Sequence, residues 1–200
     1  MAELAVLTGD IVKSTQLPDG ALEAIFDGLA QAADALAQWS DVDPCLTRAR
    51  GDGWQVVAPA PLALRAALAL RAGVRLTGKD HDTRIGIAVG TGTLPGPDLS
   101  AASGPAFVAS GHALDTMARR VRMAASGPVA LTTALPLADH IAQGWTVRQA
   151  QIALATLPPD APTQEALAQH FAIAQQSLQD IQSAAGLPAL TLACAAFEAG

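Results

Sequence analysis

The sequence predicts an α+β fold, in which a mixed sheet domain precedes a small helical tail. Residues 4–9 and 83–92 have the patterns of buried strands, whereas residues 17–38 carry apolar side chains at the spacing of an amphipathic helix. From Trp145 onward only helical patterns remain. Half of the 200 residues are hydrophobic and 15% are charged, which is the composition of a compact globular chain.

The elements of the first half follow one another as strand, helix, strand, strand, helix and strand. The first helix is expected from Leu17 to Gln38, with Pro18 in the turn that accepts proline. Turn residues at 41–44 separate it from a hairpin, whose turn is Gly51-Asp52-Gly53. A second helix is expected over residues 61–76, before the strand at 83–92. This order is that of a ferredoxin-like (βαββαβ) sheet.

The second half begins with a loop rich in glycine, proline and serine at residues 92–105. We expect a helix over 106–123 and a short strand near 128–131, and we assign residues 1–143 to the α+β domain and 144–200 to the tail. In the tail, residues 158–162 break a helix, and two short helices follow, the first capped by Thr163. This pattern predicts a helix-turn-helix, followed by a last apolar helix at 189–197.

Composition limits the classes of partner and compartment. The net charge of −6 and a pI near 5.0 argue against an extended surface for nucleic-acid phosphates. The first residues lack the positive region of a signal peptide, and no apolar run is long enough to span a bilayer. We therefore expect a cytoplasmic protein that enters no membrane. Cys45 and Cys194 suggest neither a disulfide framework nor a metal site, so two reduced thiols are expected.

Two aspartates are expected to meet at one edge of the sheet. In the predicted topology the first two strands run parallel, so Asp10 at the end of the first strand and Asp52 in the hairpin lie at the same edge. A divalent cation between them would relieve their repulsion, and oxygen ligands favour Mg²⁺ or Mn²⁺, which commonly accompany nucleotide phosphates. Ser14 and Thr15 could start a helix whose amides face a phosphate. The alternative is that Asp10 caps a helix and Asp52 is an ordinary turn residue.

Four motifs in this order resemble a known family. The segments "TGDIVKS", "RGDGWQ", "RIGIAVG" and "GPAFVASGHALD" resemble the class III adenylyl/guanylyl cyclase homology domain over residues 4–130, and are similar to the bacterial SatD family, which adds a helix-turn-helix. The resemblance implies that Asp10, Ile11 and Asp52 hold metal ions that bind a triphosphate. It also implies a homodimer, and it adds Gly51 and Gly104 to the expected ligand-binding residues.

The chain departs from the cyclase pattern at the residues that act on the substrate. Where the resemblance implies an asparagine that orients the ribose and an arginine that stabilises the transition state, this sequence has Val108 and His112. Neither side chain supplies the hydrogen bond or fixed charge that phosphoryl transfer needs. Arg48 replaces the base-selecting lysine, and the acidic partner position falls among residues 101–103, which are Ala, Ala and Ser. These departures indicate a binding site without intact cyclase machinery.

The tail suggests a different function. Gln175, Gln176 and Ser177 begin the second helix of the expected helix-turn-helix, where they could hydrogen-bond base edges in DNA. From Trp145 to Gly200, however, Arg148 is the one basic residue against four carboxylates, and phosphate contacts by Lys and Arg dominate affinity for DNA. A packing or dimerisation role for the tail is therefore favoured.

The sequence thus supports a regulatory protein that binds a divalent metal and a nucleotide or related phosphate ligand without efficient cyclisation. One alternative is a MarR-like transcriptional regulator that binds DNA through the tail. A second is a weak nucleotide cyclase or nucleotidyl-transfer enzyme, in which Arg48 and Arg50 replace the missing arginine. No histidine pattern suggests a metal site, since His81, His112, His140 and His170 lack ligand spacing.

Overall fold

The computed structural model of the chain describes residues 2–40, 45–49, 51–94, 96 and 99–200. Its five-stranded sheet has the order β2-β3-β1-β4-β5. All neighbouring strands are antiparallel except β4 and β5, which are parallel. The strands are β1 (Ala2–Ile11), β2 (Leu46–Arg48), β3 (Trp54–Pro59), β4 (Thr83–Gly92) and β5 (Met123–Ser126). The mixed α+β class predicted from the sequence is confirmed.

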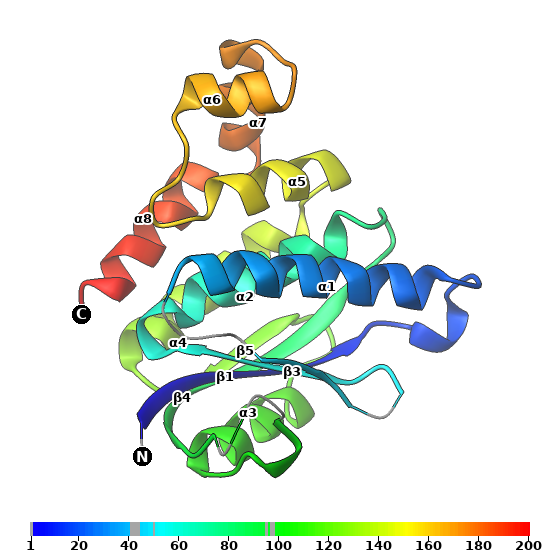
Figure 1. Cartoon of the computed structure of the whole chain (residues 1–200), viewed down its shortest axis with the longest axis vertical. Helices are drawn as coiled ribbons and strands as arrows, with labels where there is room; N and C mark the ends of the chain where they lie inside the picture. Colours follow the sequence, from blue (N-terminus) through cyan, green and yellow to red (C-terminus); the bar gives the residue numbers. More distant parts are fainter. Residues whose placement is uncertain (1, 41–44, 50, 95, 97–98) are drawn as a thin grey trace.

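Helices lie on both faces of this sheet (Figure 1). Helices α1 and α2 cover one face, α3 covers the other, and the C-terminal helices stack beyond α1 and α2. The α-helices are α1 (Ala21–Gln38), α2 (Ala63–Arg75), α3 (Pro105–Asp115), α4 (Val129–Gln143), α5 (Val147–Thr156), α6 (Gln164–His170), α7 (Gln175–Ala184) and α8 (Leu187–Glu198). Short 3-10 turns are η1 (Ser14–Gln16), η2 (Ala60–Leu62) and η3 (Leu99–Ala101).

Strand β1 is buried on both faces because helices cover the sheet on each side. Ala5, Leu7 and Ile11 pack in the large core toward α1 and α2. Leu4 and Val6 pack in a smaller core toward α3. Successive side chains of a strand point to opposite faces, which explains why this strand reads as a nearly continuous apolar run. The same alternation directs Thr8 and Asp10 to the α3 face.

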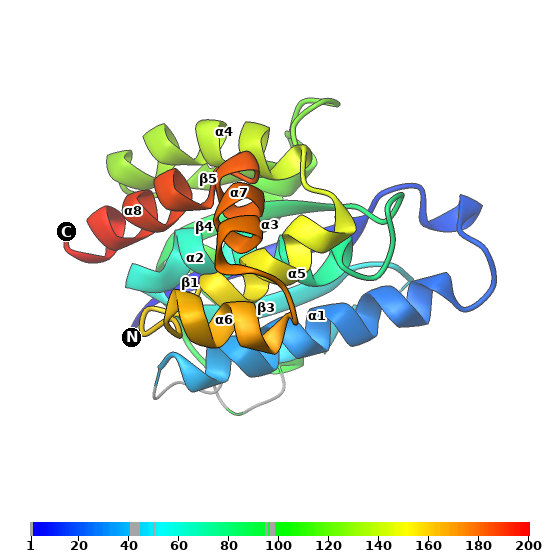
Figure 2. The same ribbon diagram turned by 90° about the horizontal axis from the view of Figure 1, so that it is seen from above.

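Helix α2 lies at the centre of the molecule. Residues 63–74 of this helix are all buried. It packs against α1 and the sheet, and also against α4, α5 and α8 (Figure 2). The tail therefore shares a core with the sheet domain.

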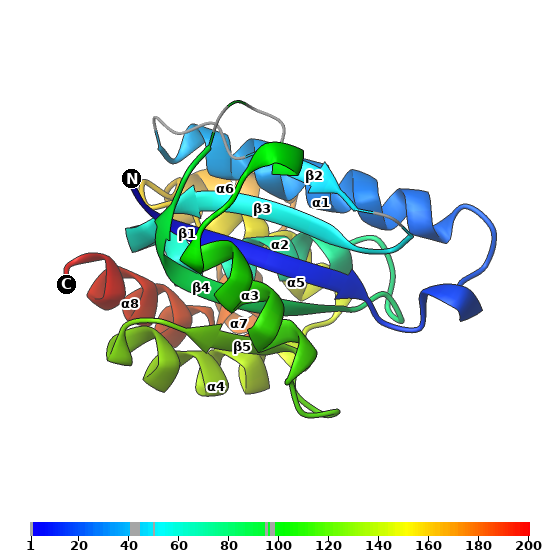
Figure 3. The same cartoon turned by 90° about the horizontal axis from the view of Figure 1, so that it is seen from below.

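Helix α3 crosses the other face of the sheet at close range (Figure 3). A Cβ atom at Gly86 in β4 would lie 2.2 Å from the carbonyl oxygen of Ser110 in α3, which is closer than packed atoms allow. The glycine of the "RIGI" motif is thus required by the approach of this helix.

The first helix begins later than predicted. We expected it to start at Leu17, but α1 begins at Ala21, and Pro18 lies outside it. Leu17 is extended, with φ −72° and ψ 144°. The helical conformation is disfavoured for a residue that precedes proline, which keeps Leu17 out of the helix. Helix α1 begins after Gly20. The predicted turn at 41–44 lies outside the described residues.

The prediction for residues 106–143 was wrong in three respects. Helix α3 ends at Asp115 rather than near residue 123, and the short strand is Met123–Ser126 rather than 128–131. Residues 129–143 form helix α4, which was not predicted. Pro128 precedes α4 and Pro136 lies inside it, and these prolines concealed its helical pattern.

The tail is helical, as predicted from Trp145 onward. The Thr163 side chain accepts a hydrogen bond from the amide of Ala166 and caps α6, as expected. Helices α6 and α7 pack on each other and are joined by residues 171–174. Across the described residues, none of the helices combines the length and apolar character required to cross a bilayer.

Candidate functional site

Asp10 ends β1 on the α3 face and is paired with an arginine. Arg84 stands opposite Asp10 in the register of β1 and β4. Its Nε donates to Asp10 Oδ1 at 2.9 Å, and its Nη2 donates to Oδ2. The backbone carbonyl of Asp10 accepts a hydrogen bond from the buried Thr83 hydroxyl at 2.6 Å. Both the backbone and the carboxylate of Asp10 are thus fixed.

The turn that carries Asp52 lies at the same end of the sheet. Gly9 pairs with Trp54, the first residue of β3, so the chain on either side of this pair continues to Asp10 and to the β2–β3 turn. The pKa of Arg84 is raised chiefly by its hydrogen bond with Asp10, and to a lesser extent by the charges of Asp10, Asp115 and Asp52, while partial burial opposes the rise. Arg84 therefore lies in the electrostatic field of three carboxylates.

This arrangement bears on the expected metal site. A cation does lie beside the Asp10 carboxylate, but it is the guanidinium of Arg84. Both oxygens of Asp10 bind Arg84, and the described residues include no group of three His, Cys, Asp or Glu side chains that could hold a metal ion. The residues as placed do not fit Mg²⁺ or Mn²⁺, because a divalent ion would have to compete with Arg84 for Asp10.

Thr8, two residues before Asp10 on the same face of β1, belongs to a polar network that reaches α3. Gln55 Nε2 donates to the Thr8 hydroxyl at 2.9 Å, and Thr8 Oγ1 lies 2.8 Å from the buried Ser110 hydroxyl. Ser110 in turn donates to the carbonyl of Phe107 at 3.0 Å. Strands β3 and β1 and helix α3 are therefore joined by side-chain hydrogen bonds next to Asp10.

Ile11 was expected to help hold a metal ion, and Ser14 and Thr15 were expected to start a helix. The Ile11 side chain is in the core, so this residue can reach the edge only through its backbone. Ser14 and Thr15 lie in η1, a three-residue 3-10 turn, and α1 begins only at Ala21. The expectation that they open a helix toward a phosphate was wrong, because Pro18 interrupts the helical pattern.

Arg48 lies on the opposite face of the sheet from Asp10. It pairs in register with Trp54, which packs toward α1 and α2. Its guanidinium forms an ion pair with Glu23 at 2.9 Å and stacks 3.9 Å above the Phe26 ring. Arg48 is thus engaged by α1, and Arg50 lies outside the described residues.

The two glycines of the expected site, Gly51 and Gly104, adopt positive φ angles where the backbone turns. Gly51 has φ 77° in the hairpin turn, a conformation that favours glycine. Gly104 has φ 134° before α3, and a Cβ atom there would lie 2.9 Å from Gly92 Cα. Because it has no side chain, Gly104 allows the loop backbone to pass close to Gly92 of β4 immediately before α3 begins.

Val108 and His112 are exposed on α3. The side chain of Val108 is 74% exposed, and His112 is also exposed. In the neighbouring loop Ser103 pairs with Thr93 through backbone hydrogen bonds. The positions that would orient a ribose and stabilise a transition state are accessible, but they carry side chains unsuited to either task.

The predicted DNA-contacting residues are exposed at the start of α7. Gln175, Gln176 and Ser177 face solvent, and Gln176 donates to Asp180 at 2.9 Å. Arg148, the basic residue of the tail, stacks on Phe171 at 4.9 Å and donates to the Phe171 carbonyl. Arg148 is therefore held against the end of α6, and it does not add a phosphate contact to the exposed surface of Gln175, Gln176 and Ser177.

The chain was compared with known proteins. No family model and no curated protein matches it. Among solved structures it is similar to a bacterial light-regulated adenylyl cyclase, with 16% identity and a TM-score of 0.46 over 62% of this chain and 76% of that one. A second solved structure, also described as a bacterial light-regulated adenylyl cyclase, has 15% identity and a TM-score of 0.46 over 62% of this chain and 43% of that one. The guanylyl cyclase Cya2 has 13% identity and a TM-score of 0.44 over 72% and 79%.

These likenesses concern the fold alone. At such identities and TM-scores they decide neither the family of the chain nor its activity. Membership of the SatD family remains an expectation from the sequence motifs.

Sequence reasoning missed Arg84 and Asp115 as members of the site. Arg84 was part of the quoted "RIGIAVG" segment, and its alternation with Ile85 and Ile87 indicates that it faces away from the large core. Its contact with Asp10 could not be inferred, because that requires the register between β1 and β4. Asp115 was assigned to the interior of a longer helix, whereas it is the last residue of α3.

Proposed function

We propose that the chain is a regulatory sensor that binds a nucleotide or a related phosphate ligand at the edge formed by Asp10, Asp52 and Arg84. The observation that carries the proposal is the Arg84 guanidinium, which binds both oxygens of Asp10 at this edge and also lies in the electrostatic field of Asp115 and Asp52. Its side chain is 36% exposed, so it can exchange partners with a ligand from solvent. Guanidinium groups bind phosphate oxygens in the same bidentate manner as carboxylates.

The role of Mg²⁺ or Mn²⁺ follows from the same pair. A phosphate that binds Arg84 would draw the guanidinium away from Asp10 and leave a carboxylate able to bind a cation. Metal and phosphate binding are therefore expected to favour each other at this edge. A metal without phosphate is expected to bind weakly, because Arg84 already neutralises Asp10.

Efficient cyclisation is not part of the proposal. Val108 has no hydrogen-bonding side chain, and His112 lacks the fixed charge of a guanidinium. Both lie on α3, the helix that covers the Asp10 face of the sheet. A ligand bound at the edge would meet no group there that stabilises the transition state of phosphoryl transfer.

The proposal also includes the strand arrangement, the domain boundaries and the pairing of chains. The pairing of β3 between β1 and β2, and of β1 between β3 and β4, supports a ferredoxin-like arrangement. We retain residues 1–143 as the sensing domain and 144–200 as a helix-turn-helix-like tail with a packing role. The proposal also retains the homodimer that the sequence resemblance implies.

The test is thermal unfolding with Mg²⁺ or Mn²⁺, with and without ATP or GTP. A ligand that binds only the native state at 100 times its Kd adds about 2.7 kcal/mol to the free energy of unfolding. We expect stabilisation of the wild type that is largest with metal and nucleotide together and is lost in Asp10→Asn/Asp52→Asn. An assay for 3′,5′-cyclic product in the same samples should detect little turnover.

The matched control is Asp27→Asn/Asp34→Asn, which removes the same charge from exposed positions of α1. This control should respond to nucleotide as the wild type does. The proposal fails if the wild type shows no shift with any pair of ligands, or if both double variants lose the shift equally. Rapid formation of cyclic product would instead support the enzyme alternative.

A further inference from the structure

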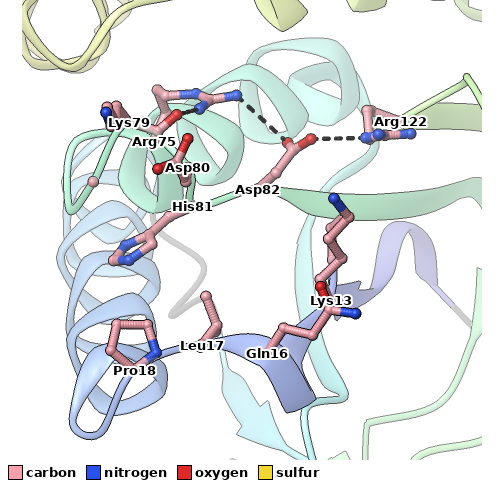
Figure 4. A pocket seen from close by; sticks show the side chains of 12 residues that line it. Lys13, Gln16, Leu17, Pro18, Arg75, Lys79, Asp80, His81, Asp82 and Arg122 are labelled. Atoms are coloured by element: carbon pink, nitrogen blue, oxygen red, sulfur yellow. Dashed lines mark hydrogen bonds and ion pairs between the residues drawn. The ribbon is translucent and has the colours of Figure 1, made fainter.

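A cavity lies between the β1–α1 connection and the α2–β4 connection (Figure 4). Its volume is about 660 Å³, which is within the range of small-molecule sites. One wall comes from residues 12–18, and the opposite wall comes from Arg75, residues 78–82 and Arg122. The Val12 amide donates to the Asp82 carbonyl at 2.9 Å and fixes one wall against the other.

Basic side chains are concentrated at this cavity. The chain contains two lysines, Lys13 and Lys79, and both line it, together with Arg75 and Arg122. Of the 12 basic residues of an acidic protein, four thus converge on one cavity. Such a concentration favours an anionic ligand.

The carboxylates of the cavity do not neutralise the lysines. Asp82 Oδ2 accepts from Arg122 Nε at 2.7 Å, and Asp82 Oδ1 lies 3.0 Å from Nη1 of the buried Arg71. Asp82 is thereby committed to arginines. Asp80 also lines the cavity, but no ion pair joins it, Lys13 or Lys79 to another of the described residues.

The backbone at Lys13 is held in an unusual conformation. Its φ is 54°, in the left-handed region that side chains other than glycine and asparagine rarely adopt. In Figure 4 its ammonium extends toward the ion pair of Asp82 and Arg122. Backbone strain of this kind persists where the surrounding structure holds a residue for function.

The rest of the lining suits the uncharged part of an organic ligand. Leu17 and Pro18 provide apolar surface, and the side chain of His81 also lines the cavity. Burial lowers the pKa of His81, which keeps the imidazole neutral at pH 7, and the Thr77 hydroxyl lies 2.7 Å from its Nδ1. The cavity therefore combines a cationic side with an uncharged side.

We propose that this cavity binds a phosphorylated small molecule, whose anionic groups are bound by Lys13, Lys79 and Arg122. Lysine ammonium groups approach phosphate oxygens as independent point charges, as two lysines from different connections require. The site is separate from the Asp10 edge, because Asp10 faces α3 whereas the cavity opens beside α1 and the end of α2. It binds its ligand without the divalent metal that the first proposal involves.

The probe is sodium pyrophosphate, titrated into the full chain in EDTA at constant ionic strength and followed by calorimetry. EDTA removes divalent metal, so the metal-assisted state of the Asp10 edge does not form. The test variant is Lys13→Asn/Lys79→Gln, in which asparagine tolerates the positive φ of residue 13. We expect binding of one pyrophosphate to the wild type and a loss of affinity of about tenfold or more in this variant.

Two further variants locate the binding. Arg119→Gln/Arg120→Gln removes two charges from exposed positions that do not line the cavity, and should retain wild-type affinity. Arg84→Gln, which removes the guanidinium of the Asp10 edge, should also retain it, which separates this proposal from the first. Absence of binding to the wild type, equal weakening in both charge-removal variants, or loss in Arg84→Gln would overturn the cavity assignment. Thermal unfolding without probe verifies that each variant is folded.

Discussion

Arg84 occupies the position at which a divalent cation was expected. The Asp10 carboxylate at the end of the sheet has a positive partner, Arg84, which comes from the neighbouring strand. The convergence of charge could be inferred from strand order, but the identity of the cation could not. It depends on the register of β1 and β4, which no local pattern in either strand determines.

Replacement of Arg84 should therefore create a better metal site. In Arg84→Gln we expect the free energy of unfolding to fall by about 1 kcal/mol, since the pair is partly exposed. We also expect Mn²⁺ alone to raise the unfolding temperature of this variant more than that of the wild type. Arg84→Lys keeps the charge and should respond to Mn²⁺ as weakly as the wild type. Equal responses of all three proteins would show that the carboxylates do not share a cation.

His81 should make stability depend on pH. Burial lowers its pKa below the ordinary value of 6.5, with Asp80 opposing this shift and Arg75 adding to it. The unfolded chain then binds a proton at a higher pH than the folded chain does. The stabilisation is therefore present above pH 6.5 and is lost as pH falls through the folded pKa. Urea unfolding between pH 7.5 and 5.5 should show a smaller pH dependence for His81→Gln than for the wild type, and identical profiles would refute this role.

At the scale of elements, the regular segments were predictable and the exceptions have physical causes. Helix α2 and strand β4 were placed correctly because their apolar patterns are long. The short β5 has small residues at 124 and 125, and among the described strands it pairs with β4 alone, so its strand character comes from tertiary contact. Helix α4 contains Pro136, a residue that ordinarily ends helices, and its packing overrides that local preference.

The contact between α1 and α2 depends on glycine. A Cβ atom at Gly73 would lie 2.4 Å from the Gly28 carbonyl oxygen and 2.8 Å from Ala32 Cβ. Gly73→Ala must push the helices apart and should lower the free energy of unfolding by about 1–3 kcal/mol. Gly111→Ala in α3 is the control, since no atom lies within 4 Å of its added Cβ. Its better helix propensity should leave stability unchanged or slightly higher, by up to about 1 kcal/mol. Urea unfolding of both variants measures the difference.

At the scale of the whole molecule, the C-terminal helices share one hydrophobic core with the sheet and α2. The change of pattern at Trp145 was visible in the sequence, but the burial of α2 beneath α5 and α8 was not. Arg65 in α2 forms two hydrogen bonds with Glu198 in α8, Nε to Oε1 at 2.5 Å and Nη2 to Oε2 at 2.9 Å. A third hydrogen bond joins Arg65 Nη1 to the Leu157 carbonyl. The last helix is therefore attached to the central helix by a nearly buried ion pair.

Loss of this pair should loosen α8. Burial raises the pKa of the Cys194 thiol to about 12, so native Cys194 should resist alkylation at pH 8. In Glu198→Gln we expect Cys194 to be alkylated faster and the free energy of unfolding to fall by about 2–3 kcal/mol, because Arg65 remains buried. Mass spectrometry of the Cys194 peptide measures the rate. Glu165→Gln, an exposed change in α6, should alter neither quantity, and unchanged labelling in Glu198→Gln would contradict the attachment.

The placement of Lys13 and Lys79 has a practical consequence for chemical biology. Because they are the only lysines in the chain, every side-chain amine belongs to one cavity. Among the side chains, acylating reagents, aldehydes and amine-directed crosslinkers would thus act at this cavity. A dye or photoreactive group attached through such chemistry would report on that cavity directly, and protection from acylation would provide a screen for the molecules that fill it.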